Sequence, residues 1–287
     1  MPLESLTGRA YGPHPFRVCS DKVAEYVLAT GDDTPRWTRF APPAFASVAL
    51  FAVAPALLES RDVAPYTRVL VHADQTFRWH LPWMIEDALS VRGTVERVRT
   101  RGSASFVTFS ATVDNAAGER ILDSGSTFLM SSESPDSLSE EESEPPVEAR
   151  ARNDFSRPTV FPGVGEELDD MWKSASRSDL VRYAGATRDW NPIHFDHDAA
   201  LAAGLPGVVV HGLLMAAWAT QTGARMVEHP LPLAEARFRF RLPLRPGQQA
   251  AVSGVVESDD GRQASLKVRV ASGGAERMSA TMVVLRT

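Results

Sequence analysis

Two stretches of the chain are apolar on every side of a helix. They are "AFASVALFAVAPALLES" (residues 44–60) and "HGLLMAAWATQTGARMVE" (residues 211–228). A helix without a polar face is a buried helix, so each stretch predicts a helix at the centre of a core. Pro55 lies inside the first stretch, where proline removes a backbone hydrogen bond. We therefore expect a kink or an early end of that helix near Pro55.

Alternating apolar and polar residues follow each buried helix. The segments "ASFVTFSATVDNAAGERILDSGSTFLM" (104–130) and "QASLKVRVASGGAERMSATMVVL" (263–285) alternate with period two around glycine-containing turns. A shorter helix precedes each buried one, in "SDKVAEYVLAT" (20–30) and "SDLVRYAGAT" (178–187), and each opens on a Ser-Asp pair suited to capping. The pattern predicts an α+β fold in which antiparallel strands wrap around a buried central helix, twice.

The two halves also repeat in sequence. "FRWHLPWMIEDALSVRGTVE" (77–96) and "FRFRLPLRPGQQAAVSGVVE" (238–257) share eight identical positions at a constant offset. Between the halves lies "SSESPDSLSEEESEPPVEARARNDFSRP" (131–158), which is too polar to bury a core and is typical of a linker. We expect a duplicated domain, with units at 1–130 and 159–287, their sheets joined and the 131–158 linker outside.

Composition excludes several classes of protein. The formal net charge of −6 leaves no basic excess for nucleic acid, so we expect no nucleic-acid partner. The apolar stretches are too short to span a bilayer, and the first residues lack the pattern of a signal peptide. One cysteine, Cys19, excludes an internal disulfide and fits a reducing cytoplasm; without a local basic partner it predicts a structural residue.

The candidate chemistry lies in "DWNPIHFDHD" (189–198). Pro192 biases Asn191 toward an extended conformation, so the chain turns between Asp189 and His194 and both side chains can face one point. Gly212 would open the buried helix, where a backbone N–H suits a developing oxyanion and the missing side chain lets a bound group approach closely. Taken alone, an Asn-Pro segment is more often a plain turn.

A metal site is the competing interpretation of the same residues. The candidate ligands share no helical His spacing and no His-x-His pattern, so we expect no metal. His197 and Asp198 are expected to face water or cap the next short helix. The candidate ligands are His194, Asp196, His197, Asp198 and His211.

Asp189, Asn191, Pro192 and His194, followed by Gly204 to His211-Gly212, resemble the signature of the MaoC-like family of (R)-specific enoyl-thioester hydratases and (3R)-hydroxyacyl-thioester dehydratases. The resemblance implies the hot-dog fold, in its double hot-dog branch. It implies that Asp189 and His194 form the acid/base pair and that the Gly212 N–H is the oxyanion donor. Asn191 would anchor the loop or the water, and His211 would support the loop.

The same resemblance implies the partners. The substrate would be a trans-2-enoyl thioester of CoA or acyl carrier protein in fatty-acyl metabolism, with no cofactor beyond that carrier, and the protein would be a homodimer. Two alternatives stay open: a hot-dog acyl-thioesterase, and a non-catalytic acyl-thioester-binding subunit.

The first half lacks the complete motif. Asp32 matches Asp189, but Trp37 stands in place of His194, and Pro-Ala-Phe (43–45) stands in place of His-Gly. Trp37 and Phe45 are bulky residues beside which an acyl chain could lie, and the resemblance implies that this degenerate half helps to form the substrate tunnel. A purely structural role, pairing two sheets and burying their apolar faces, is the alternative.

The strand "ARFRFRLPL" also permits two interpretations. It places three arginines on one face and two phenylalanines on the other, which is typical of one solvated face and one core face. The sharper hypothesis is a phosphate contact for CoA or for phosphopantetheine. The arginines are Arg237, Arg239 and Arg241.

Overall fold

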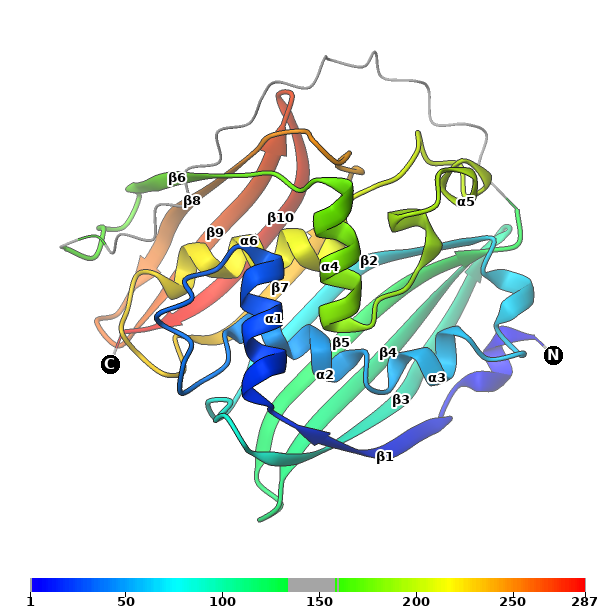
Figure 1. Cartoon of the computed structure of the whole chain (residues 1–287), viewed down its shortest axis with the longest axis horizontal. Helices are drawn as coiled ribbons and strands as arrows, with labels where there is room; N and C mark the ends of the chain where they lie inside the picture. The colour runs from blue at the N-terminus through cyan, green and yellow to red at the C-terminus, as the bar shows by residue number, and fades with distance from the viewer. Residues whose placement is uncertain (1, 134–157, 159, 287) are drawn as a thin grey trace.

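All strands of the described residues join in one antiparallel sheet. The computed structural model describes residues 2–133, 158 and 160–286, so most of the predicted linker lies outside the described residues. The sheet has ten strands in the order β1-β3-β4-β5-β2-β7-β10-β9-β8-β6 (Figure 1). The N-terminal half supplies β1 (Ala10–Arg17), β2 (Val69–Trp79), β3 (Ala88–Arg101), β4 (Ala104–Asn115) and β5 (Arg120–Ser131). The C-terminal half supplies β6 (Glu167–Lys173), β7 (Leu233–Phe240), β8 (Ala250–Asp259), β9 (Gln263–Ser272) and β10 (Ala275–Leu285).

The two halves meet where β2 pairs with β7. The pairing runs from Arg78 opposite Glu235 to Asp74 opposite Arg239, and it stops there. Ion pairs cross the same junction: Arg78 contacts Glu235 at 3.0 Å, and Arg239 contacts Asp74 at 3.3 Å. Because β7 ends at Phe240, the first residues of β2 extend beyond it and offer a free edge to the loops of the C-terminal half.

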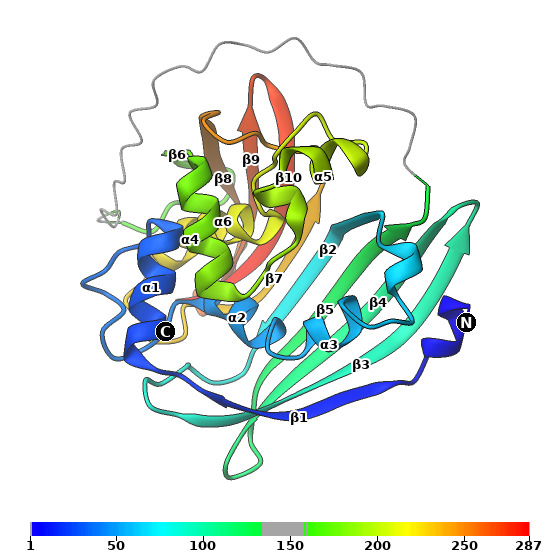
Figure 2. The ribbon, with the colours of Figure 1, turned by 45° about the vertical axis from the view of Figure 1, so that its right-hand side comes forward.

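The helices lie against the concave side of the curved sheet (Figure 2). In the C-terminal half α6 (Gly212–Ala224) is the predicted buried helix, and every residue after Gly212 is buried. The predicted extension to residue 228 is wrong, because the helix stops at Ala224. Arg36 of the other half binds the carbonyl oxygens of Ala224 and Val227 there, which satisfies groups that a further helical turn would use.

The corresponding helix of the N-terminal half is interrupted. The 3-10 turn η2 (Pro43–Phe45) leads into α2 (Ala46–Leu50), and α3 (Ala54–Leu58) follows after residues 51–53. Pro55 lies in the first turn of α3, where its missing N–H costs nothing. The predicted break near Pro55 is confirmed, although it falls just before the proline. The continuous helix over 44–60 is not formed.

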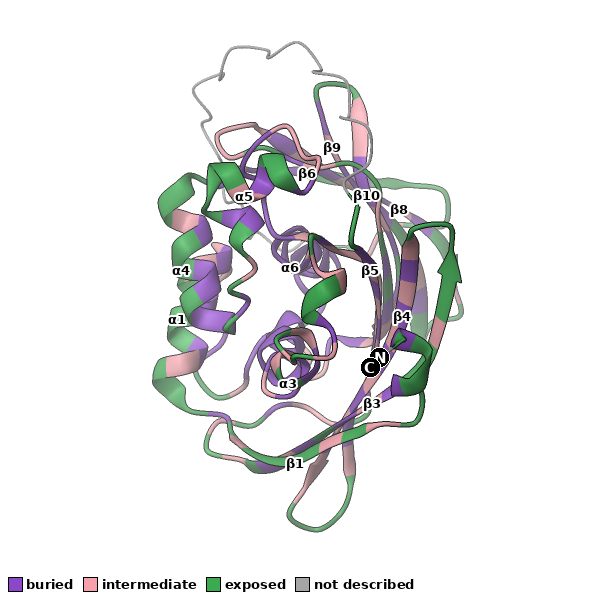
Figure 3. Ribbon diagram, turned by 90° about the vertical axis from the view of Figure 1, so that its right-hand side faces the viewer, coloured by how far each residue is buried: buried purple, intermediate pink, exposed green. Residues whose placement is uncertain are grey.

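Two short helices form the outermost layer, and Figure 3 shows them beyond the central helices. They are α1 (Ser20–Thr30) and α4 (Arg177–Thr187), and their tyrosines Tyr26 and Tyr183 pack with ring centroids 6.1 Å apart.

The Ser-Asp caps predicted for these helices are wrong. The cap of α4 is Ser176, which forms a capping box with Asp179. At α1 the N-cap is Cys19, which is exposed and makes no side-chain capping hydrogen bond.

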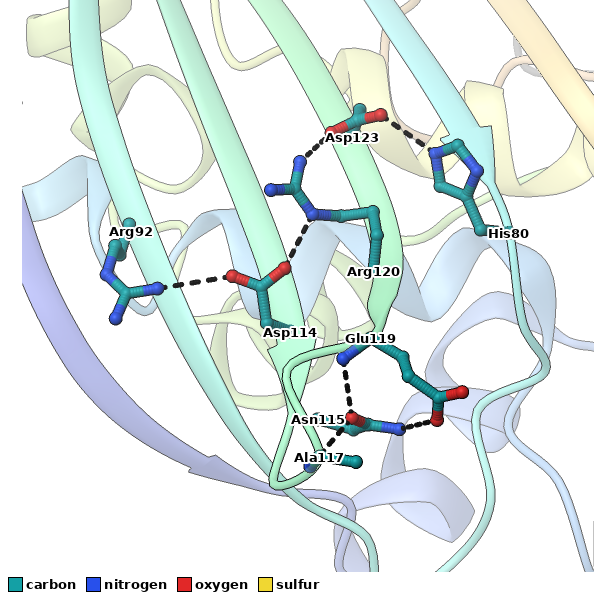
Figure 4. Close-up of polar contacts among 8 residues, drawn as sticks. All are labelled: His80, Arg92, Asp114, Asn115, Ala117, Glu119, Arg120 and Asp123. Atoms are coloured by element: carbon teal, nitrogen blue, oxygen red, sulfur yellow. Dashed lines mark hydrogen bonds and ion pairs between the residues drawn. The ribbon is translucent and has the colours of Figure 1, made fainter.

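The outer face of the sheet is polar and cross-linked by ion pairs. In Figure 4 a chain of contacts runs from His80 through Asp123, Arg120 and Asp114 to Arg92, across four neighbouring strands. Each pair is partly exposed, so its contribution is modest, but the chain favours the observed strand register. Among the described helices none is long and apolar enough to cross a membrane.

Candidate functional site

Asp189 lies two residues beyond Thr187, the last residue of α4. The helix is closed by Arg188, a non-glycine residue with a left-handed φ of 68°, and the chain then leaves the helix axis. Asp189 is 9% exposed, and its backbone N–H donates to the hydroxyl of Thr187. The reversal at Arg188 therefore turns the carboxylate inward, away from the solvated side of α4.

Asn191 fixes the loop to the other half of the molecule. Its conformation is extended, as Pro192 predicted, and its side-chain oxygen caps the 3-10 turn η4 (Pro192–His194). Its side-chain amide donates a 2.8 Å hydrogen bond to the carbonyl oxygen of Leu70, on the free edge of β2. Of the two functions expected for Asn191, the structure shows the anchoring of the loop.

His194 is held in one tautomer. Its ring is 6% exposed, and Nδ1 lies 2.8 Å from the carbonyl oxygen of Val209. A carbonyl only accepts, so Nδ1 carries the proton and Nε2 keeps a lone pair. Val209 is itself fixed, because its N–H donates to the carbonyl of Ile193 at 3.2 Å. The geometry thus presents Nε2 as an acceptor.

His211 stacks on His194. The ring centroids are 3.7 Å apart and the planes differ by 20°. His211 is fully buried and its Nε2 faces the backbone oxygen of Asp189 at 3.3 Å, which fits the supporting position that the sequence predicted. Asp189, His194 and His211 each offer a ligand-type atom, and these atoms lie within 4.8 Å of one another. The convergence of Asp189 and His194 expected from the turn is therefore present.

Burial shifts the protonation of all three side chains toward neutrality. Loss of solvation raises the pKa of Asp189 to about 7, against a smaller lowering by a backbone hydrogen bond at Asn191. Burial lowers the pKa of His194 to about 4, although the bond to Val209 opposes this. Burial and the neighbouring His194 hold the pKa of His211 well below its usual value. At neutral pH both imidazoles are neutral, and Asp189 is divided between its two forms.

The N-terminus of α6 completes the site. The helix begins at Gly212, directly after His211, and the N–H groups of a first helical turn have no acceptor within the helix. A side chain at Gly212 would meet the ring of Phe240 at 3.0 Å. The structure thus gives this glycine a packing reason, close contact with Phe240, in addition to the predicted access for a thioester.

A cavity of ≈ 660 Å³ contains these groups. Asp189, His194 and Gly212 line it, and the N-terminal half forms much of the opposite wall. That wall was not predicted residue by residue, because it depends on how the halves pack. The interruption between α2 and α3 contributes directly to it. The contributing residues of the N-terminal half include Phe51, Pro55, Leu58, Leu70, His72 and Phe128.

The predicted acyl contacts of the first half are partly wrong. Trp37 and Phe45 are both buried in the hydrophobic core, yet neither lines the cavity. Asp32 lies near Lys173, whose pKa burial lowers to about 8. No described imidazole stands beside Asp32 as His194 stands beside Asp189.

The three arginines in and just after β7 differ in their ion pairs and in their position relative to the cavity. Arg237, Arg239 and Arg241 are exposed while Phe238 is buried, which matches the simple alternation of a solvated and a core face. Arg239 pairs with Asp74 and Arg241 with Glu276. Only Arg241 of the three lines the cavity, so it alone is placed for a phosphate contact, which stays a prediction.

A metal would need different ring geometry from that observed. Asp189, His194 and His211 are the described residues that could hold one. Imidazole lone pairs lie in the plane of the ring, and two stacked rings direct them side by side and not to a common point. His197 and Asp198, the other candidate ligands, are exposed on α5 (His197–Ala202), which Asp196 caps. The donor set therefore fits an ion poorly in this arrangement.

The fold is that of a double hot-dog protein, in which Asp189 and His194 meet at one cavity. The family model described as "MaoC like domain" matches residues 161–276 of the chain. The family model described as "FAS1-like, dehydratase domain region" matches residues 5–124. The chain belongs to the MaoC-like dehydratases.

Curated relatives carry little functional information. A UPF0336 protein of Cutibacterium acnes is 30% identical over 125 residues, which are 42% of this chain and 88% of that protein. A UPF0336 protein of Streptomyces coelicolor is 30% identical over 133 residues, with the same coverage. The mitochondrial 3-hydroxyacyl-[acyl-carrier-protein] dehydratase of Arabidopsis thaliana is 43% identical over 52 residues, 18% of this chain and 31% of that protein.

Solved structures support the fold over the full length. A MaoC-like dehydratase superposes with a TM-score of 0.82 at 25% identity and covers 100% of both chains. HtdX of Mycobacterium tuberculosis gives 0.68 at 21% identity, covering 96% of this chain and 98% of that one. Rv0216 of the same organism, described as a double hot-dog fold, gives 0.69 at 15% identity, covering 97% and 96%. The predicted fold class is confirmed.

Proposed function

We propose that this chain catalyses the reversible hydration of a trans-2-enoyl thioester to the (3R)-3-hydroxyacyl thioester. The observation that carries the proposal is the meeting of Asp189 and His194 with the N-terminus of α6 in one largely apolar cavity. Adding water to such a substrate needs a base for the water, a proton for the α-carbon and a donor for the thioester oxygen. Asp189 can meet the first two requirements in turn, and the Gly212 N–H can meet the third.

In the proposed reaction each hydrogen of the attacking water has a partner among the side chains of the site. The ionised Asp189 takes one proton, while Nε2 of His194 accepts a hydrogen bond from the other O–H and orients the oxygen toward the β-carbon. The protonated Asp189 then delivers its proton to the α-carbon, so the protein ends unchanged. The Gly212 N–H, with the helix dipole behind it, stabilises the negative charge on the thioester oxygen between these steps. His211 keeps the His194 ring in place by stacking.

The cavity supports an acyl group of some size. Its wall in the N-terminal half is apolar, and it occupies the place where the first central helix is interrupted. The degenerate half therefore fits the expected tunnel role through Phe51 and Leu58, although not through Trp37. Action in fatty-acyl metabolism, a cytoplasmic location and a homodimer stay predictions from the family resemblance.

One assay separates this proposal from its alternatives. Incubation with crotonyl-CoA should reduce the enoyl absorbance without releasing free thiol. Release of thiol would show the thioesterase instead, and no change in either signal, with binding retained, would show a non-catalytic acyl-thioester-binding subunit.

A further inference from the structure

Three arginines near the end of β3 share an open hollow on the outer face of the sheet. The hollow is lined by Arg97, Arg99 and Arg101, together with three threonines and Phe106, and no carboxylate lines it. All three arginines are exposed. None of them forms an ion pair with a carboxylate in the described part of the chain, which concentrates positive charge on a protein with a net charge of −6.

Four other arginines of the same sheet differ in this respect. Arg78, Arg92, Arg120 and Arg239 each contact a carboxylate on a neighbouring strand. An unpaired row of like charges carries a repulsive cost that neighbouring acids relieve elsewhere on this face. The row at Arg97, Arg99 and Arg101 therefore fits a site whose negative partner comes from another molecule.

The spacing of the row favours a helix as that partner. The three residues alternate along regular strand, opposite Thr108, Phe106 and Ala104 of β4. Alternate residues of a strand are about 6.6 Å apart. Acidic side chains one turn apart on a helix are about 6 Å apart, so a row of carboxylates on one helix face can meet the three guanidinium groups together.

The row also lies at the end of the sheet that flanks the cavity. Arg101 is opposite Ala104, Ala104 is opposite Ser131, and Ser131 is opposite Val69, which precedes the cavity residue Leu70. Three strand spacings separate Arg101 from Val69, about 14 Å. The row is on the outer face and the cavity is on the concave side, so a flexible thioester arm from a protein docked at the row would pass around this end of the sheet.

We propose that Arg97, Arg99 and Arg101 form the docking surface for an acidic helix of a carrier protein that brings the acyl thioester to the cavity. The proposal rests on the proposed hydratase function for the identity of the cargo. The row then determines which carrier is recognised. It binds the carrier protein, whereas a substrate on CoA does not contact it.

The test compares two carriers of one acyl group. Full-length protein and the variant Arg97→Ser/Arg99→Ser/Arg101→Ser are assayed with crotonyl-CoA and with the crotonyl thioester of a freestanding acyl carrier protein. We expect KM for the carrier-protein substrate to rise about tenfold or more in the variant, and more so at low ionic strength, since surface charges act mainly on encounter. KM for crotonyl-CoA should not change.

A second triple variant controls for net charge. Arg262→Ser/Lys267→Ser/Arg269→Ser removes three exposed cations from β9 and the turn before it, in the other half, and should leave KM for both substrates unchanged. Equal KM values for wild type and the β3 variant on the carrier protein would overturn the proposal. An equal rise in KM for both substrates would overturn the proposal too, in favour of a site for the CoA nucleotide.

Direct titration with the holo carrier protein separates this proposal from the hydratase assignment. If neither substrate reacts, the hydratase assignment fails, while binding of the carrier protein that the β3 variant weakens still supports the docking surface. Binding that the variant leaves unchanged overturns the docking surface, whether or not the substrates react.

Discussion

The guanidinium of Arg36 donates a 2.6 Å hydrogen bond to the carbonyl oxygen of Ala224, the last residue of α6. A second bond, of 2.8 Å, goes to the carbonyl of Val227. Arg36 lies next to Trp37, at the position where the N-terminal half lost its histidine. The degenerate loop therefore holds the far end of the helix that presents Gly212 to the cavity. A cation at a helix C-terminus is also the favourable partner of its dipole.

Replacing Arg36 should loosen this end of the helix. We expect Arg36→Met to lower the free energy of unfolding by about 1–3 kcal/mol, because two carbonyls lose a charged donor. Thermal unfolding measures it, with Arg39→Met as the matched control, since Arg39 is exposed and its guanidinium lies 5.8 Å from the centroid of the nearby Phe40 ring. Equal melting temperatures for the two variants would show that the clamp contributes nothing.

Replacing either Asp189 or His194 should reduce the hydratase rate by a similar factor. Asp189→Asn keeps the shape but removes the base, so the hydratase rate should drop by roughly two to four orders of magnitude, and His194→Ala should do likewise. The double variant should be little worse than either single one, because the residues act as a unit. Steady-state rates on one enoyl-CoA, with folding checked by circular dichroism, provide the measurement.

Asp32→Asn is the internal control for that series. Asp32 holds the matching place in the repeat but faces Lys173 and Arg36, without an imidazole. Its replacement should change the rate only several-fold and act through affinity or stability. A folded Asp32→Asn variant as inactive as Asp189→Asn would make the first half catalytic and contradict the assignment of one site.

The rate of hydration should depend on pH through Asp189. Its pKa is raised to about 7, and the proposed base is the ionised form. We expect kcat/KM for hydration to rise with pH up to about 7 and then to level off, while His194, with a pKa of about 4, stays neutral across that range. A rate that falls above pH 7 would instead make the protonated carboxyl the active form.

The buried carboxylate of Asp189 should lower the free energy of unfolding at high pH, where it is ionised. Its folded pKa lies above its unfolded value of about 3.9, so the folded state binds more protons and stability declines as pH rises from about 4 to about 7. We expect Asp189→Asn to melt at a higher temperature than wild type at pH 8, with little difference at pH 4.5. Unfolding curves at both values decide it, and a variant less stable than wild type at pH 8 would contradict the burial argument.

The stacked imidazoles lead to a prediction about metal. Because the planes of His194 and His211 differ by only 20°, their lone pairs do not converge on one ion. Activity should therefore survive prolonged incubation with a chelator, followed by assay in metal-free buffer. Loss of activity that zinc or iron restores, with one ion bound per chain, would replace the proposed chemistry with a metal-assisted reaction.

The sequence was most informative where the geometry is local. Pro192 and a five-residue spacing bring Asp189 and His194 together within one loop, and Gly212 starts the buried helix as expected. The same holds for the interruption near Pro55, which follows from the chemistry of proline.

Features that depend on contact between the halves were not predictable. The bond from Asn191 to Leu70, the position of His72 in the cavity and the early end of α6 all require the relative placement of distant segments. The edge strand β1 was missed for a local reason, because Pro13 and Pro15 interrupt the alternation that marks a strand. Trp37 was expected to lie beside the acyl chain, but the size of a side chain alone does not show on which side of the core its ring lies.

The unequal central helices have a consequence for how such a chain can change. Two identical subunits must each keep an intact helix for chemistry and also make room for substrate, because any substitution appears in both. In a fused chain the two copies vary independently. Here α6 stays whole while its counterpart is split into α2 and α3, and Phe51 at the break and Pro55 and Leu58 of α3 line the cavity. Substitutions around residues 51–58 can therefore reshape the space for the acyl group while the reacting end of the molecule keeps its geometry.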